Sequence, residues 1–425
     1  MKNRTFLVQH LLPLLFALII SVTCFFFNST RHLFFPLDHP EASIHIPDTS
    51  VRTYVNYNGG YSAELNIRNA FQSGSPIVLF GSSELARPDL TAIPYNFFRN
   101  TVKFPCIAMG HAGNQSLSMA VQLAALHEDL SKAKLVFMIS PGWFFGTYAA
   151  GTSVQSFLEF ANEHFLYRIW NDPEVSHEFK DQLADYVVAH FKDIDSPSSI
   201  LRLIYYSRTG DLNIFKRIVN YPFIAAHKAY TGFKTELMDK LFENGYAAFP
   251  YSTEKRTIGK PDNAENIDQL LRDPNWDSLM ADALEQFAKQ SDNNSFGVEN
   301  AYFNQHVRDL EGKKHVDPPS IQNSTEFKDL CLLLSLVKHL GGKPLFIIQP
   351  LNPLTHDDLH ILQPTLNRIT EELKKNGFEY YNMYDPEIPN YIKGTLADVM
   401  HMGNYGWLKA DKKIMEYFFT NKTGK

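Results

Sequence analysis

The chain has 425 residues, of which 44% are hydrophobic, 13% aromatic and 20% charged. This composition provides enough apolar surface for a sizeable core and excludes a largely disordered protein. The 40 basic and 46 acidic residues leave a formal net charge of −6, which argues against a general nucleic-acid binder. The three cysteines form no CxxC pair, so neither a disulfide framework nor a cysteine-ligated zinc site is expected.

The N-terminus has the pattern of a membrane anchor. Lys2 and Arg4 precede an uncharged run over residues 6–27, whose cleanest stretch, residues 11–27, is about as long as the shortest helix that crosses a bilayer. The basic flank places the N-terminus in the cytoplasm and the rest of the chain outside the cytoplasmic membrane. A cleaved secretory signal and a buried soluble helix are the alternatives, but no small-x-small cleavage site follows the run. We therefore predict a cytoplasmic tip and a retained transmembrane signal anchor over residues 1–28.

The next segments are predicted to be a linker, residues 29–70, and an extracytoplasmic domain, residues 71–420. The linker contains three prolines that break any long helix. In the domain, short apolar runs bounded by Gly, Pro or Ser suit strands that are buried on both faces of a parallel sheet. These four runs are residues 76–80, 104–109, 134–140 and 344–349, and residues 380–384, which follow a helix stop at Gly377, are predicted to be a fifth strand.

Helical patterns alternate with these strands and occupy residues 115–130, 326–340, 357–375 and 407–419. This alternation predicts an α/β fold with a doubly wound parallel sheet. Residues 152–316 break the rhythm, because they are rich in charges and in aromatics at helical spacing and contain no comparable strand run. We expect them to form a large, mostly helical insertion between the third and fourth strands.

The first strand is followed by residues that suit nucleophilic chemistry. Ligands of open parallel sheets bind beyond the carboxyl ends of the strands, and there the chain reads Gly81-Ser82-Ser83. A serine just before a helix can project its hydroxyl into the crevice, beside amide donors that stabilise an oxyanion. The alternative is that Ser82 or Ser83 only caps the helix.

A serine hydroxyl needs a base, and His401 is the histidine in a suitable context, after the last strand and ahead of the final helix. Asp398, three residues earlier, can hold the imidazole and fix its tautomer. The alternative for this Asp-x-x-His pair is a surface pair or a fragment of a metal site. No HExxH motif or histidine-rich cluster supplies further ligands, so neither a metal nor another cofactor is expected.

The combination of these patterns resembles the SGNH-type (GDSL-like) hydrolases. Those enzymes have Gly-x-Ser after the first strand, a glycine after the second, here Gly110, and Asp-x-x-His near the C-terminus. Ser82 replaces their usual aspartate, and residues 140–144 (SPGWF) replace their Gly-x-Asn-Asp. With these departures, the chain resembles the DltD family, the D-alanyl transfer proteins of lipoteichoic acid modification. The motifs that carry the resemblance are GSSEL at 81–85, SPGWF at 140–144, NWD at 275–277, NSFGV at 294–298 with Tyr302, and DVMHMGNYGW at 398–407.

The resemblance implies an SGNH-hydrolase-like domain and an extracytoplasmic serine acyl-transfer enzyme. Such an enzyme would take part in the D-alanine esterification of teichoic-type cell-envelope polymers through an acyl-serine intermediate. By the match, Ser83 is the nucleophile, His401 the base and Asp398 the residue that orients the base.

The resemblance also implies an oxyanion hole that includes the amides of Ser83 and Gly110. The asparagine that normally completes this hole is missing, so a third donor has to come from elsewhere. Trp143, with its indole N–H, and Asn114 are the candidates by position.

The partners implied by the resemblance are the cytoplasmic membrane, a D-alanyl carrier protein, a membrane O-acyltransferase of the same pathway and a teichoic-type polymer as acceptor. No nucleic-acid partner is expected. Two alternatives stay open. One is an SGNH-type esterase or thioesterase acting on a cell-envelope substrate, and the other is a non-catalytic, membrane-anchored assembly factor for the D-alanylation machinery.

Overall fold

The computed structural model describes residues 71, 74, 76–110, 112–127, 130–210, 273–292, 294–308 and 324–419. The predicted anchor over residues 1–28 and the predicted linker over residues 29–70 lie outside the described residues. In the part of the chain that is described, no helix combines the length and the apolar character that crossing a membrane requires.

A five-stranded, fully parallel sheet forms the centre of the fold, and each predicted strand corresponds to one of its members. The strands are β1 (Ile77–Gly81), β2 (Cys106–Gly110), β3 (Lys134–Ile139), β4 (Leu345–Ile348) and β5 (Glu379–Asn382). Their spatial order is β2-β1-β3-β4-β5. The chain moves from β1 to one side and then returns to the other side, so a topological switch point lies between β1 and β3. Ligand sites of such sheets lie at the carboxyl ends of the strands beside this point.

Strands β1 to β4 are buried on both faces over nearly their whole length, as two-sided apolar strands require, whereas the edge strand β5 is partly exposed. Alternate residues of β1 enter two different cores, with Val78 and Phe80 in one and Ile77 and Leu79 in the other. The register places Phe80 opposite Phe137 of β3, which in turn lies opposite Phe346 of β4. The ring centroids of these neighbours are 4.8 and 5.2 Å apart, so a row of stacked phenylalanines ties the three central strands together.

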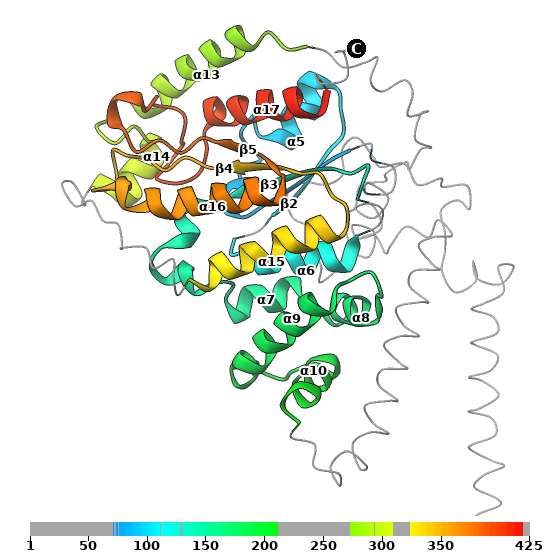
Figure 1. The fold of residues 1–425 in the computed structure, drawn as a ribbon. Helices are drawn as coiled ribbons and strands as arrows, with labels where there is room; N and C mark the ends of the chain where they lie inside the picture. Colours follow the sequence, from blue (N-terminus) through cyan, green and yellow to red (C-terminus); the bar gives the residue numbers. More distant parts are fainter. Residues whose placement is uncertain are drawn as a thin grey trace, which may run out of the picture.

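Helices cover both faces of the sheet (Figure 1). One face carries α6 (Ser116–Leu126), α15 (Thr325–His339) and α16 (Gln363–Asn376), and the other carries α5 (Pro94–Phe97) and α17 (Asn404–Phe419). The four predicted helices correspond to α6, α15, α16 and α17, with shifted ends. The largest shift is at α16, because a separate 3-10 turn, η9 (Leu359–Leu362), comes before it.

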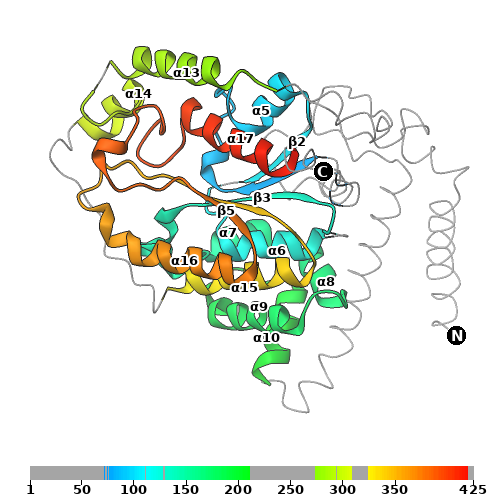
Figure 2. The ribbon, with the colours of Figure 1, turned by 45° about the horizontal axis from the view of Figure 1, so that its top comes forward.

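The segment between β3 and β4 adds further helices to both sides. In its described part these are α7 (Val154–Phe160), α8 (Glu163–Asn171), α9 (His177–His190), α10 (Ser199–Thr209), α13 (Trp276–Ser291) and α14 (Asn300–Tyr302), without a β-strand. Helices α7 to α10 lie on the outer side of α6 and α15, whereas α13 lies over α17 (Figures 1 and 2). The aromatics that recur at helical spacing are core residues here, since Phe157 and Phe165 are fully buried.

The loop that leads into α17 folds tightly on itself. The Gly403 N–H donates to the Thr395 carbonyl at 3.0 Å, and Leu396 forms an antiparallel bridge with Met402. A Cβ atom on Gly406 would overlap the Thr395 carbonyl oxygen. Gly403 and Gly406 are therefore needed because the backbone that precedes Asp398 passes too close to them for a side chain.

We predict that Gly406→Ala destabilises the protein, although alanine is the better helix former and usually stabilises a helix by up to about 1 kcal/mol. The added methyl group must push the Thr395 carbonyl away, and such overpacking costs about 1–3 kcal/mol. Chemical denaturation followed by circular dichroism measures the free energy of unfolding. The control is Gly142→Ala, whose methyl group meets only the flexible Ser140 hydroxyl at 3.3 Å. A Gly406→Ala variant as stable as that control would contradict the steric explanation.

Candidate active site

Ser83 stands directly beyond the carboxyl end of β1, at the switch point of the sheet. It opens η2 (Ser83–Leu85), a single 3-10 turn, so the longer helix expected after the serine does not form. Pro88 follows closely, and a proline disfavours helical backbone in the residue before it. The Ser82 side chain makes no capping hydrogen bond at this turn, and the capping alternative is therefore wrong for Ser82.

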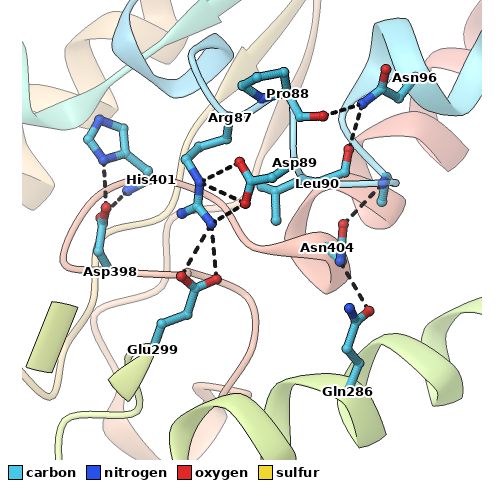
Figure 3. Close-up of polar contacts among 11 residues, drawn as sticks. Arg87, Pro88, Asp89, Leu90, Asn96, Gln286, Glu299, Asp398, His401 and Asn404 are labelled. Atoms are coloured by element: carbon cyan, nitrogen blue, oxygen red, sulfur yellow. Dashed lines mark hydrogen bonds and ion pairs between the residues drawn. The ribbon is translucent and has the colours of Figure 1, made fainter. Parts of the chain in front are cut away.

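Ser83, His401 and Asp398 form one hydrogen-bonded series, although Ser83 and His401 are 318 residues apart in the sequence. The Ser83 Oγ lies 2.8 Å from His401 Nε2, and His401 Nδ1 lies 2.7 Å from Asp398 Oδ2. The second carboxylate oxygen accepts the backbone N–H groups of His401 at 2.7 Å and Met400 at 2.9 Å. Figure 3 shows the Asp398 contacts at the base of the ring. This spatial order, a carboxylate that orients an imidazole next to a hydroxyl, is what a serine nucleophile with a general base requires.

Neighbouring charges shift the pKa values of His401 and Asp398. Burial disfavours the charged imidazolium, but the hydrogen bond and charge of Asp398 and the charge of Glu84 outweigh it, so the pKa of His401 lies above its ordinary value. Burial likewise works to raise the pKa of Asp398. The hydrogen bond and charge of His401, with the two backbone N–H donors, overcome it and leave the pKa of Asp398 below its ordinary value. Asp398 is therefore ionised when the ring takes up a proton.

Glu84, next to the serine, is the second carboxylate of the site. Its side chain is buried, and its Oε1 accepts the Ser82 N–H at 2.7 Å. Burial raises the pKa of Glu84, and the Ser82 N–H and the charge of His401 oppose that rise. A charged Glu84 works to raise the pKa of His401, and its hydrogen bond to the Ser82 N–H holds the turn that carries Ser83.

Two glycines let the nucleophile turn sit against the neighbouring strand. Gly81 and Gly110 face each other at the ends of β1 and β2. A Cβ atom on Gly110 would lie 2.6 Å from Leu85 Cδ1, and one on Gly81 would lie 2.6 Å from Glu84 Oε1. Neither glycine has a positive φ, so both are required for close approach and not for an unusual backbone conformation. The predicted oxyanion residue Gly110 therefore lies beside the turn that carries Ser83.

The structure distinguishes the two candidates for the third oxyanion donor. Asn114 is fully buried, and its amide nitrogen donates to the Gly81 carbonyl at 2.8 Å while its oxygen accepts from Gln122 at 2.6 Å. Its polar atoms are used inside the protein, so Asn114 serves as a brace for the end of β1. Trp143 lies in η4 (Pro141–Phe144), just beyond the carboxyl end of β3, the strand next to β1. Within the described ranges no hydrogen bond occupies its indole N–H, which makes Trp143 the better candidate.

Sequence reasoning missed Arg87, whose guanidinium lies next to the His401–Asp398 pair in Figure 3. It bonds to Asp89 at 2.8 Å and reaches Glu299 at 3.2 Å. Asp89 is the largest cause of the raised pKa of Arg87, and the positive charge of Arg87 in turn works to lower the pKa of His401. The only hint in the sequence was that Arg87 lies four residues after Ser83. Its partner Glu299 is 212 residues away in the chain, so no local pattern links the two.

The NSFGV motif, residues 294–298, supports the loop that carries the base. The Asn294 amide donates to the Val298 carbonyl at 2.6 Å, which closes a compact turn. The next residue, Glu299, donates its N–H to the Ala397 carbonyl at 2.8 Å, directly before Asp398. Through the Arg87–Glu299 ion pair, this turn also connects to the turn that carries Ser83, so it contacts both halves of the candidate site.

Known proteins resemble this chain over most of its length. The sequence profile of the family described as "DltD protein" matches residues 58–419. The Protein DltD of Bacillus subtilis (strain 168) is 26% identical over 356 residues, which cover 81% of this chain and 82% of that protein. The Protein DltD of Staphylococcus aureus (strain NCTC 8325 / PS 47) is 23% identical over 355 residues, 82% of each chain. The Protein DltD of Lacticaseibacillus rhamnosus is 24% identical over 381 residues, 84% of this chain and 80% of that protein.

The charge of Glu84 gives a testable pH dependence. The rate at which a fluorophosphonate probe labels Ser83 should follow the neutral fraction of His401, and fall with decreasing pH around a midpoint above that of free imidazole, about 6.5. Glu84→Gln keeps an acceptor for the Ser82 N–H but removes the negative charge that favours imidazolium. We therefore expect its midpoint to move to lower pH. Glu371→Gln, on the exposed face of α16, is the control and should leave the midpoint unchanged. An unshifted midpoint in Glu84→Gln would mean that Glu84 is already protonated.

Proposed function

The chain belongs to the DltD family, and from this membership we propose that it is an extracytoplasmic serine acyl-transfer enzyme in the D-alanine esterification of teichoic-type cell-envelope polymers. The hydrogen-bonded series of Ser83, His401 and Asp398 is the main support for an enzyme. A non-catalytic assembly factor has no need of a hydroxyl, an imidazole and a carboxylate in hydrogen-bond contact at the ligand edge of a sheet.

In the first half of the proposed reaction, the Ser83 oxygen attacks the acyl carbonyl of a D-alanyl donor. His401 Nε2 takes the hydroxyl proton, and Asp398 stabilises the resulting imidazolium. When the tetrahedral intermediate collapses, the bond to the leaving alcohol or thiol breaks, and His401 returns the proton to that group. The product is a D-alanyl ester of Ser83.

In the second half, a hydroxyl of the polymer attacks the acyl-serine. His401 removes the proton of this hydroxyl, and the bond between the acyl carbon and Ser83 Oγ breaks. The proton then passes from His401 to Ser83, which restores the free enzyme. Each transfer adds an ammonium group to a polyanion and so weakens its attraction for cations.

An oxyanion forms in both halves and needs preorganised donors. We assign this role to the amides of Ser83 and Gly110 and to the indole N–H of Trp143. Support comes from the position of Gly110 opposite Gly81 and from that of Trp143 beyond the neighbouring strand. Asn114, which holds the Gly81 carbonyl, is left out of this set.

The remaining parts of the proposal follow from the family and the sequence. The domain over residues 71–420 is assigned an SGNH-hydrolase-like fold, with the helical insertion at about 152–316, and residues 1–28 are assigned the transmembrane anchor. The chain would then be a single-pass membrane protein with a cytoplasmic N-terminus and an extracytoplasmic catalytic domain. Its proposed partners are a D-alanyl carrier protein, a membrane O-acyltransferase and the polymer acceptor.

Hydrolysis is the second candidate, because the same triad can pass the acyl group to water. The His401 side chain is 26% exposed, so solvent reaches the base. The acceptor distinguishes the two reactions. An acyl-Ser83 released onto a polyol phosphate supports transfer, and release onto water alone supports an esterase or thioesterase.

We predict that Ser83→Ala lowers the D-alanine ester content of the envelope to that of a strain lacking the gene. Removing the nucleophile of a triad typically costs a factor on the order of 10⁶ in rate. Base-labile D-alanine would be measured in whole envelopes of the deletion strain complemented with each variant. Ser335→Ala, on an exposed turn of α15, is the matched serine control and should restore the esters. Normal ester content with Ser83→Ala would refute the transfer proposal.

Trp143→Phe tests the third oxyanion donor, because it keeps the aromatic ring and removes the N–H. We expect the rate constant for Ser83 acylation by a p-nitrophenyl ester to fall by a factor on the order of 10², with KM within about twofold. The control is Trp170→Phe in α8, on the far side of α6 from the sheet. If both variants acylate at the wild-type rate, the third donor is not Trp143.

A further inference from the structure

A cluster of polar side chains lies at the end of the domain opposite the active site. Helix α6 follows β2 and α15 precedes β4, so the C-terminal ends of both helices lie at the amino edge of the parallel sheet. The end of α8 lies beside them (Figures 1 and 2). His127 is the C-cap of α6, and Asp172 is the C-cap of α8. Helix C-termini carry partial negative charge, so their convergence favours a cation.

His127 is the unusual member of this cluster. Its side chain is only 3% exposed, yet neither ring nitrogen has a hydrogen-bond partner. Its Nε2 lies 3.1 Å from Asp172 Oδ2, and its Nδ1 lies 3.9 Å from Glu174 Oε2. A buried imidazole without hydrogen bonds is costly, and a cation shared with Asp172 would satisfy the ring nitrogen at this short distance.

We propose that His127, Asp172 and Glu174 bind a divalent transition-metal ion, for which Zn²⁺ is the best match. One ligand atom from each residue lies within 4.8 Å of the others. Two donors that each lie about 2.1 Å from one zinc ion are about 3.0–3.4 Å apart, depending on the angle between them. The 3.1 Å between His127 Nε2 and Asp172 Oδ2 falls in this range. A donor set of one imidazole and two carboxylates suits zinc better than Ca²⁺ or Mg²⁺, which prefer oxygen alone.

The surrounding contacts hold the ligands in place. Asp172 Oδ1 accepts the Glu174 N–H at 2.8 Å, which leaves Oδ2 directed to His127. The ammonium group of Lys180 contacts the Asp172 carbonyl at 2.6 Å, and His339 Nε2, at the end of α15, contacts the Glu174 carbonyl at 2.8 Å. Such outer contacts fix ligand orientation in metal sites.

The site is open on one side, because the Glu174 side chain is 73% exposed and that of Asp172 is 30% exposed. An ion can therefore enter from solvent without unfolding. Bound there, it would neutralise the two carboxylates and tie α6 to the turn between α8 and α9. The site is remote from Ser83, so the ion is expected to stabilise the fold and to leave the triad chemistry unchanged.

The test uses the full-length protein in detergent, stripped of metal with a chelator. Zn²⁺ is titrated in competition with a chromophoric chelator, and the melting temperature is measured with and without Zn²⁺. We expect wild type to bind one more equivalent of Zn²⁺ tightly than Asp172→Asn does. Asp172→Asn and Glu174→Gln should each lower the Zn²⁺ affinity of that site at least about tenfold. Zn²⁺ should raise the melting temperature of wild type by several degrees and that of the variants by less.

Asp195→Asn is the matched control, since Asp195 is exposed and lies in the same stretch of chain. It should bind Zn²⁺ as wild type does. Because Glu174 is mostly exposed, Glu174→Gln tests the site even if another variant folds poorly. Equal Zn²⁺ affinity and stoichiometry in wild type, Asp172→Asn and Glu174→Gln would overturn the proposal. The rate of Ser83 labelling should be the same in all of them, so this result is independent of the proposed function.

Discussion

The hydrogen bond between Ser83 and His401 joins two short loops, which the Arg87–Glu299 ion pair and the Glu299–Ala397 hydrogen bond also connect. Its 2.8 Å length depends on two separate supports. The sheet fixes the serine, because β1 is the strand between β2 and β3 and all of its residues are buried. The fully buried Trp407 and the tight turn at Gly403 fix the histidine. In the proposed reaction, a displacement of about 1 Å can cost a factor of about a hundred in rate, so these supports matter in addition to the three polar residues.

Buried charge is the second constraint on the site, and it is balanced locally. Glu84 and Asp398 are both buried acids, which burial alone would tend to protonate. Backbone N–H donors hold each carboxylate, at Ser82 for one and at Met400 and His401 for the other. Arg87 adds a positive charge nearby and is itself held by carboxylates. Opposing charges therefore act on His401, and no single residue sets its pKa.

The sequence predicts the strands from local patterns and, through the family motifs, the meeting of Ser83 with His401. It does not predict distant contacts that belong to no motif. Four of the five strands were found because apolar runs bounded by breakers have few other structures open to them. Strand β5, with the sequence EYYN, was found from its place after the glycine that ends α16. The DltD resemblance was confirmed. The turn after Ser83 was misjudged as a helix, since a serine followed by Glu84 and Leu85 also fits a helix start. The pairing of Arg87 with Glu299 spans 212 residues and leaves no periodic pattern. The contact between His127 and Asp172 likewise follows from no sequence pattern and is seen only in the folded chain.

Helix α6 runs from the Ser83 edge of the sheet to the His127 cluster at the opposite edge, so its packing decides whether the two sites influence each other. Asn114, just before it, holds the end of β1 through the Gly81 carbonyl, and His127 closes its other end. Every residue of α6 is buried, so the helix is clamped between the sheet and the outer helices along its whole length. A close-packed interior resists small sliding movements, and energetic coupling between sites needs an element with two arrangements. With α6 packed in this way, a contact added at His127 is expected to raise the free energy of unfolding without displacing Ser83.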